Sequence, residues 1–267
     1  MSRVCRAVLI AVLAAPGAAP LAAGEGAAER LVVFAPWCME KRLRRIVELF
    51  QEKCPTVPVR FTTGTPGQLI SRVRKGARPD VYIAMGPAEV EVLGSLKLVR
   101  AGTPREILRQ RLVLALGEKA RGRVKSLRDL ASPDLPSVGL GRPLLTSGRL
   151  GRVALKKAGV LEAVAPKART SPLRSLVLGD VEAAIVYEEC VYQEDLFVGA
   201  TVLRAGIAFA EPFPKSACES FPSIALAVAG EGRHPEAATF VQTLTTKRAQ
   251  DILHRRGEWA CPICEME

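Results

Sequence analysis

Short apolar runs alternate along this chain with longer amphipathic segments. The first apolar run, Leu31–Phe34, stops at Pro36 and is followed by Glu40–Lys53, in which apolar residues recur at helical spacing. A buried strand that leads through a short turn into a helix presents backbone N–H groups to a crevice beyond the end of the strand. We therefore expect a ligand at this turn, around Pro36, Trp37 and Cys38.

The same alternation continues to the end of the sequence. Further strands are predicted at Val57–Phe61, Pro79–Ala84, Arg111–Leu116, Ser137–Leu140, Ala183–Tyr187, Val202–Ala208 and Ser223–Ala229. Further helices are predicted at Gln68–Lys75, Pro87–Leu93, Ser126–Leu130, Arg149–Lys157, Pro235–Thr245 and Lys247–Arg256, with another capped by Thr170–Pro172. Strands that alternate with helices form mainly parallel sheets of strand–helix–strand units, so the predicted fold class is α/β.

The order of the elements also predicts two similar lobes, because a second set of strands and helices begins near residue 113. We expect residues 30–112 and about 205–257 to form the first lobe and residues 113–204 the second. The chain then crosses between the lobes twice. Residues 258–267 form a short tail that contains cysteines.

A second turn offers ligand donors. Residues Thr62 to Gly67 are rich in hydroxyls and glycine, and they connect a predicted strand to the helix Gln68–Lys75. Such a turn either aims hydroxyl and N–H groups at the same crevice as the first turn or serves only as a capped helix start.

The first 23 residues have the character of a secretory signal. Arg3 and Arg6 precede the apolar segment Ala7–Ala15, and Leu21–Ala23 ends in small residues suited to cleavage. The apolar segment is too short to span a bilayer. We expect the mature protein to be periplasmic or otherwise extracytoplasmic.

The charge balance narrows the class of ligand. Lysine and arginine number 38 against 27 acidic residues, and the formal net charge is +11. A basic surface suits nucleic acid, an anionic membrane or an anionic ligand. Aromatic residues make up only 5% of the chain, so the stacking platforms of nucleic-acid binders are missing from the sequence, and no nucleic-acid partner is predicted.

Catalysis is not predicted either. The sequence has no GxSxG, P-loop or HExxH motif. His234 precedes a proline at a predicted helix start and His254 lies in a basic terminal helix, so neither has the setting of a catalytic triad. We expect no enzyme activity and no cofactor.

Six cysteines remain once Cys5 is assigned to the signal: Cys38, Cys54, Cys190, Cys218, Cys261 and Cys264. An even number in an exported chain permits disulfides. Cys261 and Cys264, which have the CxxC spacing, are interpreted as forming structural disulfides with other cysteines such as Cys54 or Cys218; a redox pair or a metal clip is the alternative. Soft sulfur ligands near the crevice, from Cys38, Met85 and Cys190, form a second binding hypothesis: a soft metal or a thiophilic ligand.

Several anchors occur in the order and spacing of a known family. They are LVVFA, PTVPVRF, RPDVYIAMGPAEVEVL, LRDLASPDLPSVGLGRP, GDVEAAIVY and HPEAATFVQTLTTKRAQDILHRRG. From about Leu31 to Gly257 the chain resembles the periplasmic molybdate-binding proteins of ABC importers, which have the type II periplasmic binding protein fold. The resemblance implies a monomer whose lobes close on a tetrahedral oxyanion, molybdate or tungstate, and deliver it to an ABC permease.

The resemblance also implies a site of neutral donors in the cleft between the lobes. These would lie at Cys38, where relatives carry serine, at Thr63 and Thr65, near Gly139, at Thr170 and Ser171, and at the Tyr187 hydroxyl. A thiol is a weaker donor than a hydroxyl, and Pro66 has no N–H, so two expected donors are degraded here. Glu188 and Glu189 would repel an oxyanion if they faced the cleft, and otherwise point to solvent.

Overall fold

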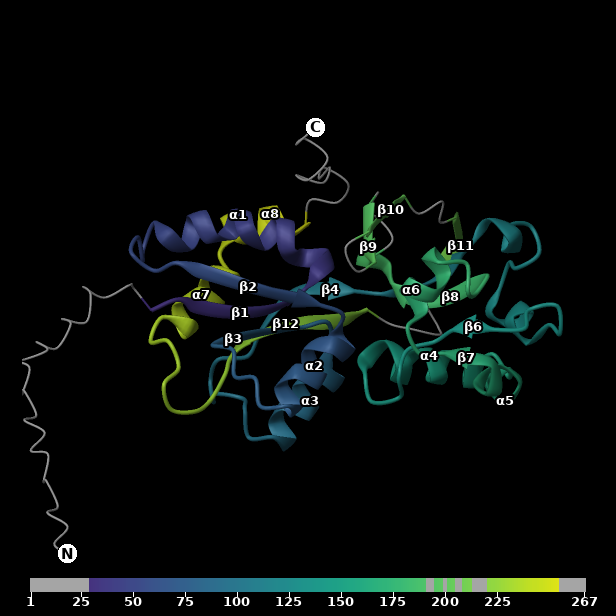
Figure 1. Ribbon diagram of the computed structural model, residues 1–267, viewed down its shortest axis with the longest axis horizontal. Helices are drawn as coiled ribbons and strands as arrows, with labels where there is room; N and C mark the ends of the chain where they lie inside the picture. The colour runs from purple at the N-terminus through teal and green to yellow at the C-terminus, as the bar shows by residue number, and fades with distance from the viewer. Residues whose placement is uncertain (1–28, 191–194, 199–200, 205–207, 213–219, 255–267) are drawn as a thin grey trace, which may run out of the picture.

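The computed structural model of the chain describes residues 29–190, 195–198, 201–204, 208–212 and 220–254, which form two α/β lobes side by side (Figure 1). The predicted signal segment, Cys218 and the CxxC pair lie outside these described residues. No helix of the described part is long and apolar enough to cross a membrane.

The first lobe is built on a five-stranded sheet. Its strands are, in spatial order, β2 (Val59–Gly64), β1 (Leu31–Pro36), β3 (Val81–Ala84), β12 (Phe221–Ala227) and β4 (Arg105–Gln110). β1 runs parallel to β2 and β3, whereas β12 is antiparallel to β3 and β4.

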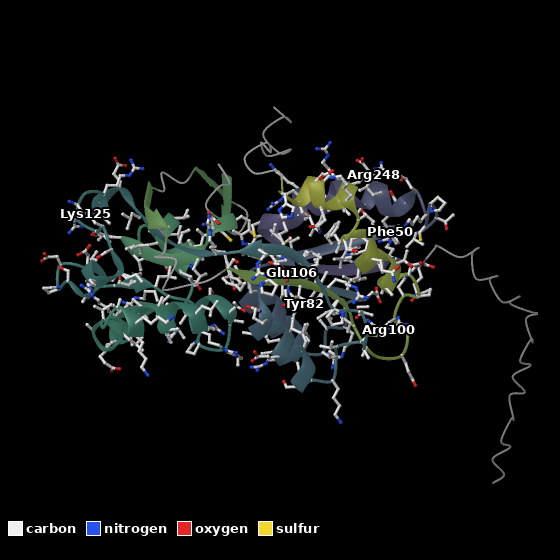
Figure 2. The ribbon with its side chains drawn as sticks, turned by 180° about the vertical axis from the view of Figure 1, so that it is seen from behind. Phe50, Tyr82, Arg100, Glu106, Lys125 and Arg248 are labelled. Atoms are coloured by element: carbon white, nitrogen blue, oxygen red, sulfur yellow. The ribbon has the colours of Figure 1, made fainter. Side chains whose placement is uncertain are left out.

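Helices cover both faces of this sheet (Figure 1). One face carries α1 (Glu40–Gln51), α7 (Ala237–Thr243) and α8 (Lys247–His254), and the other carries α2 (Pro66–Arg74) and α3 (Pro87–Ser95). Figure 2 shows a large aromatic residue in each layer: Phe50 of α1 packs edge-on against Phe240 at 5.3 Å between ring centroids, and Tyr82 lies in the core beneath α2 and α3. Burial of these apolar faces holds the helices to the sheet.

The second lobe has a five-stranded sheet of its own. In spatial order its strands are β11 (Ala208–Pro212), β5 (Leu112–Leu116), β8 (Ala183–Tyr187), β6 (Val138–Gly139) and β7 (Ala168–Arg169). Its helices are α4 (Thr146–Lys157), α5 (Leu161–Val164) and α6 (Pro172–Val177), and β9 (Asp195–Val198) pairs with β10 (Thr201–Arg204) as a hairpin. Short 3-10 turns lie at η1 (Trp37–Met39), η2 (Glu118–Ala120), η3 (Leu127–Ala131), η4 (Ala165–Lys167) and η5 (Glu188–Cys190).

The sheets are mixed, where the sequence predicted mainly parallel ones. In the second lobe β5 is antiparallel to both β8 and β11, as β12 is to its neighbours in the first lobe. The physical reason is the chain path: β5 and β12 are the strands that enter a lobe from the other one, so they run away from the cleft. The strands of the strand–helix–strand units point toward it.

The crossing points follow from the same pairings. β4 lies in the first sheet and β5 in the second, so the chain first crosses between the sheets near Arg111. The return falls later than the expected residue 205, because β11 pairs with β5 and still belongs to the second sheet. The single strand expected at Val202–Ala208 corresponds to the end of β10 and the start of β11, with residues 205–207 outside the described part.

Candidate functional site

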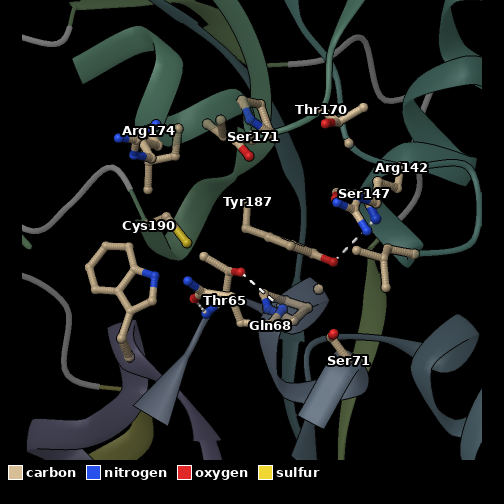
Figure 3. Close-up of a pocket in the computed structure, with 18 residues that line it drawn as sticks. Thr65, Gln68, Ser71, Arg142, Ser147, Thr170, Ser171, Arg174, Tyr187 and Cys190 are labelled. Carbon is tan, nitrogen blue, oxygen red and sulfur yellow. Dashed lines mark hydrogen bonds between the residues drawn. The ribbon is translucent and has the colours of Figure 1, made fainter. Parts of the chain in front are cut away.

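A cavity of about 300 Å³ lies between the two lobes (Figure 3). The first lobe contributes the η1 turn and the start of α2, and the second contributes the starts of α4 and α6 and the end of β8. Its lining residues are Trp37, Thr65, Pro66, Gly67, Gln68, Ser71, Gly141, Arg142, Leu145, Ser147, Thr170, Ser171, Pro172, Leu173, Arg174, Val186, Tyr187 and Cys190. Both predicted strand–turn–helix units of the first lobe therefore reach this cavity.

Tyr187 forms the floor of the cavity. It is the last residue of the apolar strand β8, so its ring lies at the end of the strand that faces the other lobe. The phenolic oxygen accepts a hydrogen bond from the Ser147 backbone N–H at 3.2 Å and donates to Glu89 Oε1 at 3.4 Å. Burial raises the pKa of Tyr187 well above its ordinary value, and the nearby Glu89 adds to the effect, so the hydroxyl stays protonated.

Glu89 joins the two lobes beneath that floor. It lies on α3 of the first lobe with a side chain that is 0% exposed, and its carboxyl accepts bonds from the backbone N–H and hydroxyl of Thr146, at 3.1 and 2.5 Å. Burial raises the pKa of Glu89, although the hydrogen bonds from Thr146 oppose the shift. A Cβ on Gly86 would lie 2.4 Å from the Thr146 side chain, so a glycine is required where the lobes meet.

The start of α2, in the first lobe, forms a wall of the cavity. Thr65 is its N-cap: the hydroxyl accepts from the Gln68 N–H at 3.3 Å, and the Gln68 side chain accepts from the Thr65 N–H at 2.9 Å. This capping box starts the helix at Pro66, two residues before the predicted Gln68, because proline suits the first helical position. The turn is thus a capped helix start whose Thr65 and Gln68 also face the cavity.

The structure brings five of the predicted site residues together in the lining: Trp37, Thr65, Thr170, Ser171 and Tyr187. The other four, Pro36, Cys38, Thr63 and Gly139, are not lining residues. Cys38 is 3% exposed because the η1 turn directs Trp37 outward and Cys38 into the core.

Two of the remaining positions have a packing reason of their own. Thr63 lies opposite Ala35 in the β1–β2 pairing and is half-buried within the sheet. A Cβ on Gly139 would lie 2.5 Å from Ala184 Cβ and 2.9 Å from Pro172 Cα. Gly139 therefore lets the start of α6 lie close against β6, which places Ser171 at the cavity.

Other lining residues were not predicted, notably Ser71, Arg142, Ser147 and Arg174. The sequence placed the start of α4 at Arg149, whereas the helix begins at Thr146 and so carries Ser147 in its first turn. The consecutive hydroxyls of Thr146 and Ser147, next to a glycine-rich turn, were the signal for that start.

The sulfur atoms do not gather at the cavity. Cys190 lines it, whereas Cys38 and Met85 are buried in the core, where Met85 Sδ accepts a hydrogen bond from Gln110 Nε2 at 3.4 Å. Within the described ranges no group of three or more His, Cys, Asp or Glu side chains is arranged to hold a metal ion. No disulfide joins Cys38, Cys54 and Cys190, the cysteines of the described part.

The carboxylate of Glu188 does not face the cavity. It is buried and forms a two-point ion pair with Arg111, at 2.8 Å from Nη2 to Oε1 and 3.2 Å from Nε to Oε2. This pairing neutralises a charge that sits directly after Tyr187 in the sequence. The sequence predicted that Glu188 would either face the cleft or point to solvent. It does neither, because it forms an ion pair with Arg111 where the chain crosses between the lobes.

Comparison with known proteins identifies the class. The sequence pattern of the bacterial extracellular solute-binding proteins matches residues 31–257, and the chain belongs to this family. Proteins of this class bind a solute outside the cytoplasm and are not enzymes. The chain is also 26% identical, over 188 residues, to the molybdate-binding protein ModA of Mycobacterium bovis, a match that covers 68% of this chain and 71% of that protein.

Solved structures show the same fold. The periplasmic molybdate-binding protein of Azotobacter vinelandii superposes with a TM-score of 0.63 at 15% identity, covering 87% of this chain and 99% of that one. The sulfate-binding protein SubI from Mycobacterium tuberculosis gives a TM-score of 0.64 at 16% identity, covering 84% of each chain. Both are similar to this protein in their two-lobed α/β architecture, which is the type II periplasmic binding protein fold.

Proposed function

We propose that this protein captures a small oxyanion in the cavity between its lobes and hands it to the permease of an ABC importer. Molybdate and tungstate are the first candidates, since the curated relative with 26% identity is a molybdate-binding protein. The protein would act as a periplasmic monomer after removal of residues 1–23.

The observation that carries this proposal is the convergence of hydroxyl donors on one cavity from both lobes. Thr65 and Ser71 lie on one side, Ser147 and Ser171 on the other, and the Tyr187 hydroxyl lies between them (Figure 3). Oxyanions are held well by several fixed dipoles, because hydroxyl and N–H groups pay little desolvation cost in a shielded site. The sulfur-based alternative lacks such support, since only Cys190 of its three predicted ligands lines the cavity.

The test is calorimetric titration of the protein lacking residues 1–23 with molybdate, tungstate, sulfate, phosphate and copper(I). Binding of molybdate or tungstate with sulfate excluded is the expected result. Binding of copper(I) alone would overturn the proposal in favour of capture by sulfur. No binding of any oxyanion would overturn the proposal as well.

A further inference from the structure

The lining of this cavity contains two arginines in addition to its neutral donors. Arg142, in the loop before α4, and Arg174, on α6, both line it. In the described part of the chain no carboxylate pairs with either guanidinium, whereas Arg149 of the same lobe forms a two-point ion pair with Glu91. An arginine beside a cleft and without an acidic partner is suited to bind an anionic group of a ligand at two points.

The arginines lie at different ends of the cavity. Figure 3 shows Arg142 beside Ser147, on the side toward which the Tyr187 hydroxyl points, and Arg174 on the other side of the tyrosine ring, toward Cys190. The position of Arg142 agrees with its backbone, whose carbonyl oxygen lies against Gly148 at the start of α4. Two guanidinium groups on opposite sides of the Tyr187 ring offer a ligand two separate points of attachment.

The size and the walls of the cavity agree with a longer ligand. A tetrahedral oxyanion occupies the volume of about two to three water molecules, roughly 60–90 Å³, against a cavity of about 300 Å³. The lining also contains apolar side chains, which make no hydrogen bond to a bare oxyanion but can pack against carbon atoms of a ligand. These are Trp37, Leu145, Leu173 and Val186.

We infer that the cleft takes a short organic molecule with a phosphate-type group at the Tyr187, Ser147 and Arg142 end and a second anionic group at Arg174. The inference rests on the proposed function, because the phosphate-type group uses the same oxyanion end. It extends the class of ligand from a bare oxyanion to an organic molecule that carries such a group at one end and a second anionic group at the other. Arg174 is then the residue that determines specificity, and the apolar wall contacts the carbon chain.

Three phosphonates of the same length test this directly, because they differ only in the group at the far end. Calorimetric titration compares 3-phosphonopropionate, propylphosphonate and 2-aminoethylphosphonate, which carry a carboxylate, a methyl and an ammonium group. A carboxylate bound by Arg174 is expected to bind at least about tenfold tighter than the methyl analogue, and the ammonium analogue should be weakest. Equal affinities, or the reverse order, would overturn the inference.

Single substitutions assign the two ends. Arg174→Gln should abolish the preference for the carboxylate and leave the affinity for propylphosphonate within about twofold. Arg142→Gln should weaken all three phosphonates alike. Arg128→Gln, an exposed arginine of the same lobe that does not line the cavity, is the matched control and should change nothing. A carboxylate preference that survives Arg174→Gln contradicts the assignment.

The result separates this inference from the proposed function. Molybdate and tungstate are titrated alongside: if they bind and no phosphonate does, the organic ligand class is wrong and oxyanion capture stands. If no anion of either kind binds, both are wrong. Because each comparison is made between ligands on one variant, a loss of folding cannot imitate the expected loss of preference.

Discussion

The Tyr187 hydroxyl is fixed in a way that suits a donor to an anion. It accepts from the Ser147 N–H and lies 3.4 Å from Glu89 Oε1, a long and therefore weak bond. A ligand oxygen in the cavity competes for the same phenolic proton. Because this proton is the only one the side chain has, the strength of the Glu89 contact sets how much of it is available to a ligand.

Tyr187→Phe tests this role. Loss of a hydrogen bond to a charged ligand is expected to weaken oxyanion binding by about 1–3 kcal/mol, measured by calorimetric titration. Tyr82→Phe is the matched control, since the Tyr82 hydroxyl is buried, makes no hydrogen bond within the described part and does not line the cavity. Tyr82→Phe should leave affinity unchanged and keep or raise stability; an unchanged affinity in Tyr187→Phe would remove that hydroxyl from the site.

Some residues could be predicted at the crevice from the ends of strands and helices, and they line the cavity. Tyr187 ends an apolar strand, and Thr65 precedes a proline that starts a helix. Cys38 was placed there too, yet it points into the core, because the direction of a side chain in a 3-10 turn does not follow from spacing along the chain. Arg142 and Arg174 were missed, since nothing distinguishes them in sequence from the many surface arginines.

At the scale of elements, the strands and helices with a strong apolar period were predicted to within a few residues. β4 was missed because it is an edge strand whose exposed positions carry Arg105, Glu106 and Arg109, which dilute the apolar signal. The antiparallel direction of β12 could not be predicted from the sequence either, because it depends on where the chain leaves the second lobe and enters the first. The start of α4 matters most for the site, since it carries both Thr146 and Ser147.

That helix start depends on a glycine. A Cβ on Gly148 would lie 1.9 Å from the Arg142 carbonyl oxygen and 2.4 Å from that of Gly141, both of them backbone atoms that cannot rotate away. Gly148→Ala should therefore push α4 from the loop, destabilise the protein by about 1–3 kcal/mol in urea unfolding, and weaken ligand binding. In contrast, Gly94→Ala on α3, which meets nothing within 4 Å, should be stabilising by up to about 1 kcal/mol. Equal stability of the two variants would refute the close contact.

At the scale of the whole molecule, α3 of the first lobe contacts α4 of the second. Glu89 makes a buried contact with Thr146, and Glu91, two residues further along α3, makes an exposed ion pair with Arg149. The pKa values of these two carboxyls are shifted in opposite directions. Burial raises the pKa of Glu89, whereas the hydrogen bond and charge of Arg149 lower the pKa of Glu91. The two contacts between the lobes therefore respond to pH with opposite signs.

The difference in unfolding free energy between the wild type and Glu89→Gln should change with pH accordingly. Below the ordinary glutamate pKa the carboxyl is protonated in both states, and its contribution is fully present; as the pH rises through the higher pKa of the folded state, ionisation of the buried group removes it. Wild type should thus lose stability relative to Glu89→Gln in urea unfolding as the pH rises above the ordinary glutamate pKa. Glu91→Gln is the control with the opposite sign. Because the pKa of Glu91 is lowered in the folded protein, its ion pair with Arg149 stabilises the wild type above the ordinary glutamate pKa, and this stabilisation is lost as the pH falls through the folded-state pKa. The difference in unfolding free energy should be small, because both side chains are exposed. A Glu89→Gln difference that stays constant over this range would mean that the contact between the lobes does not depend on a titrating carboxyl.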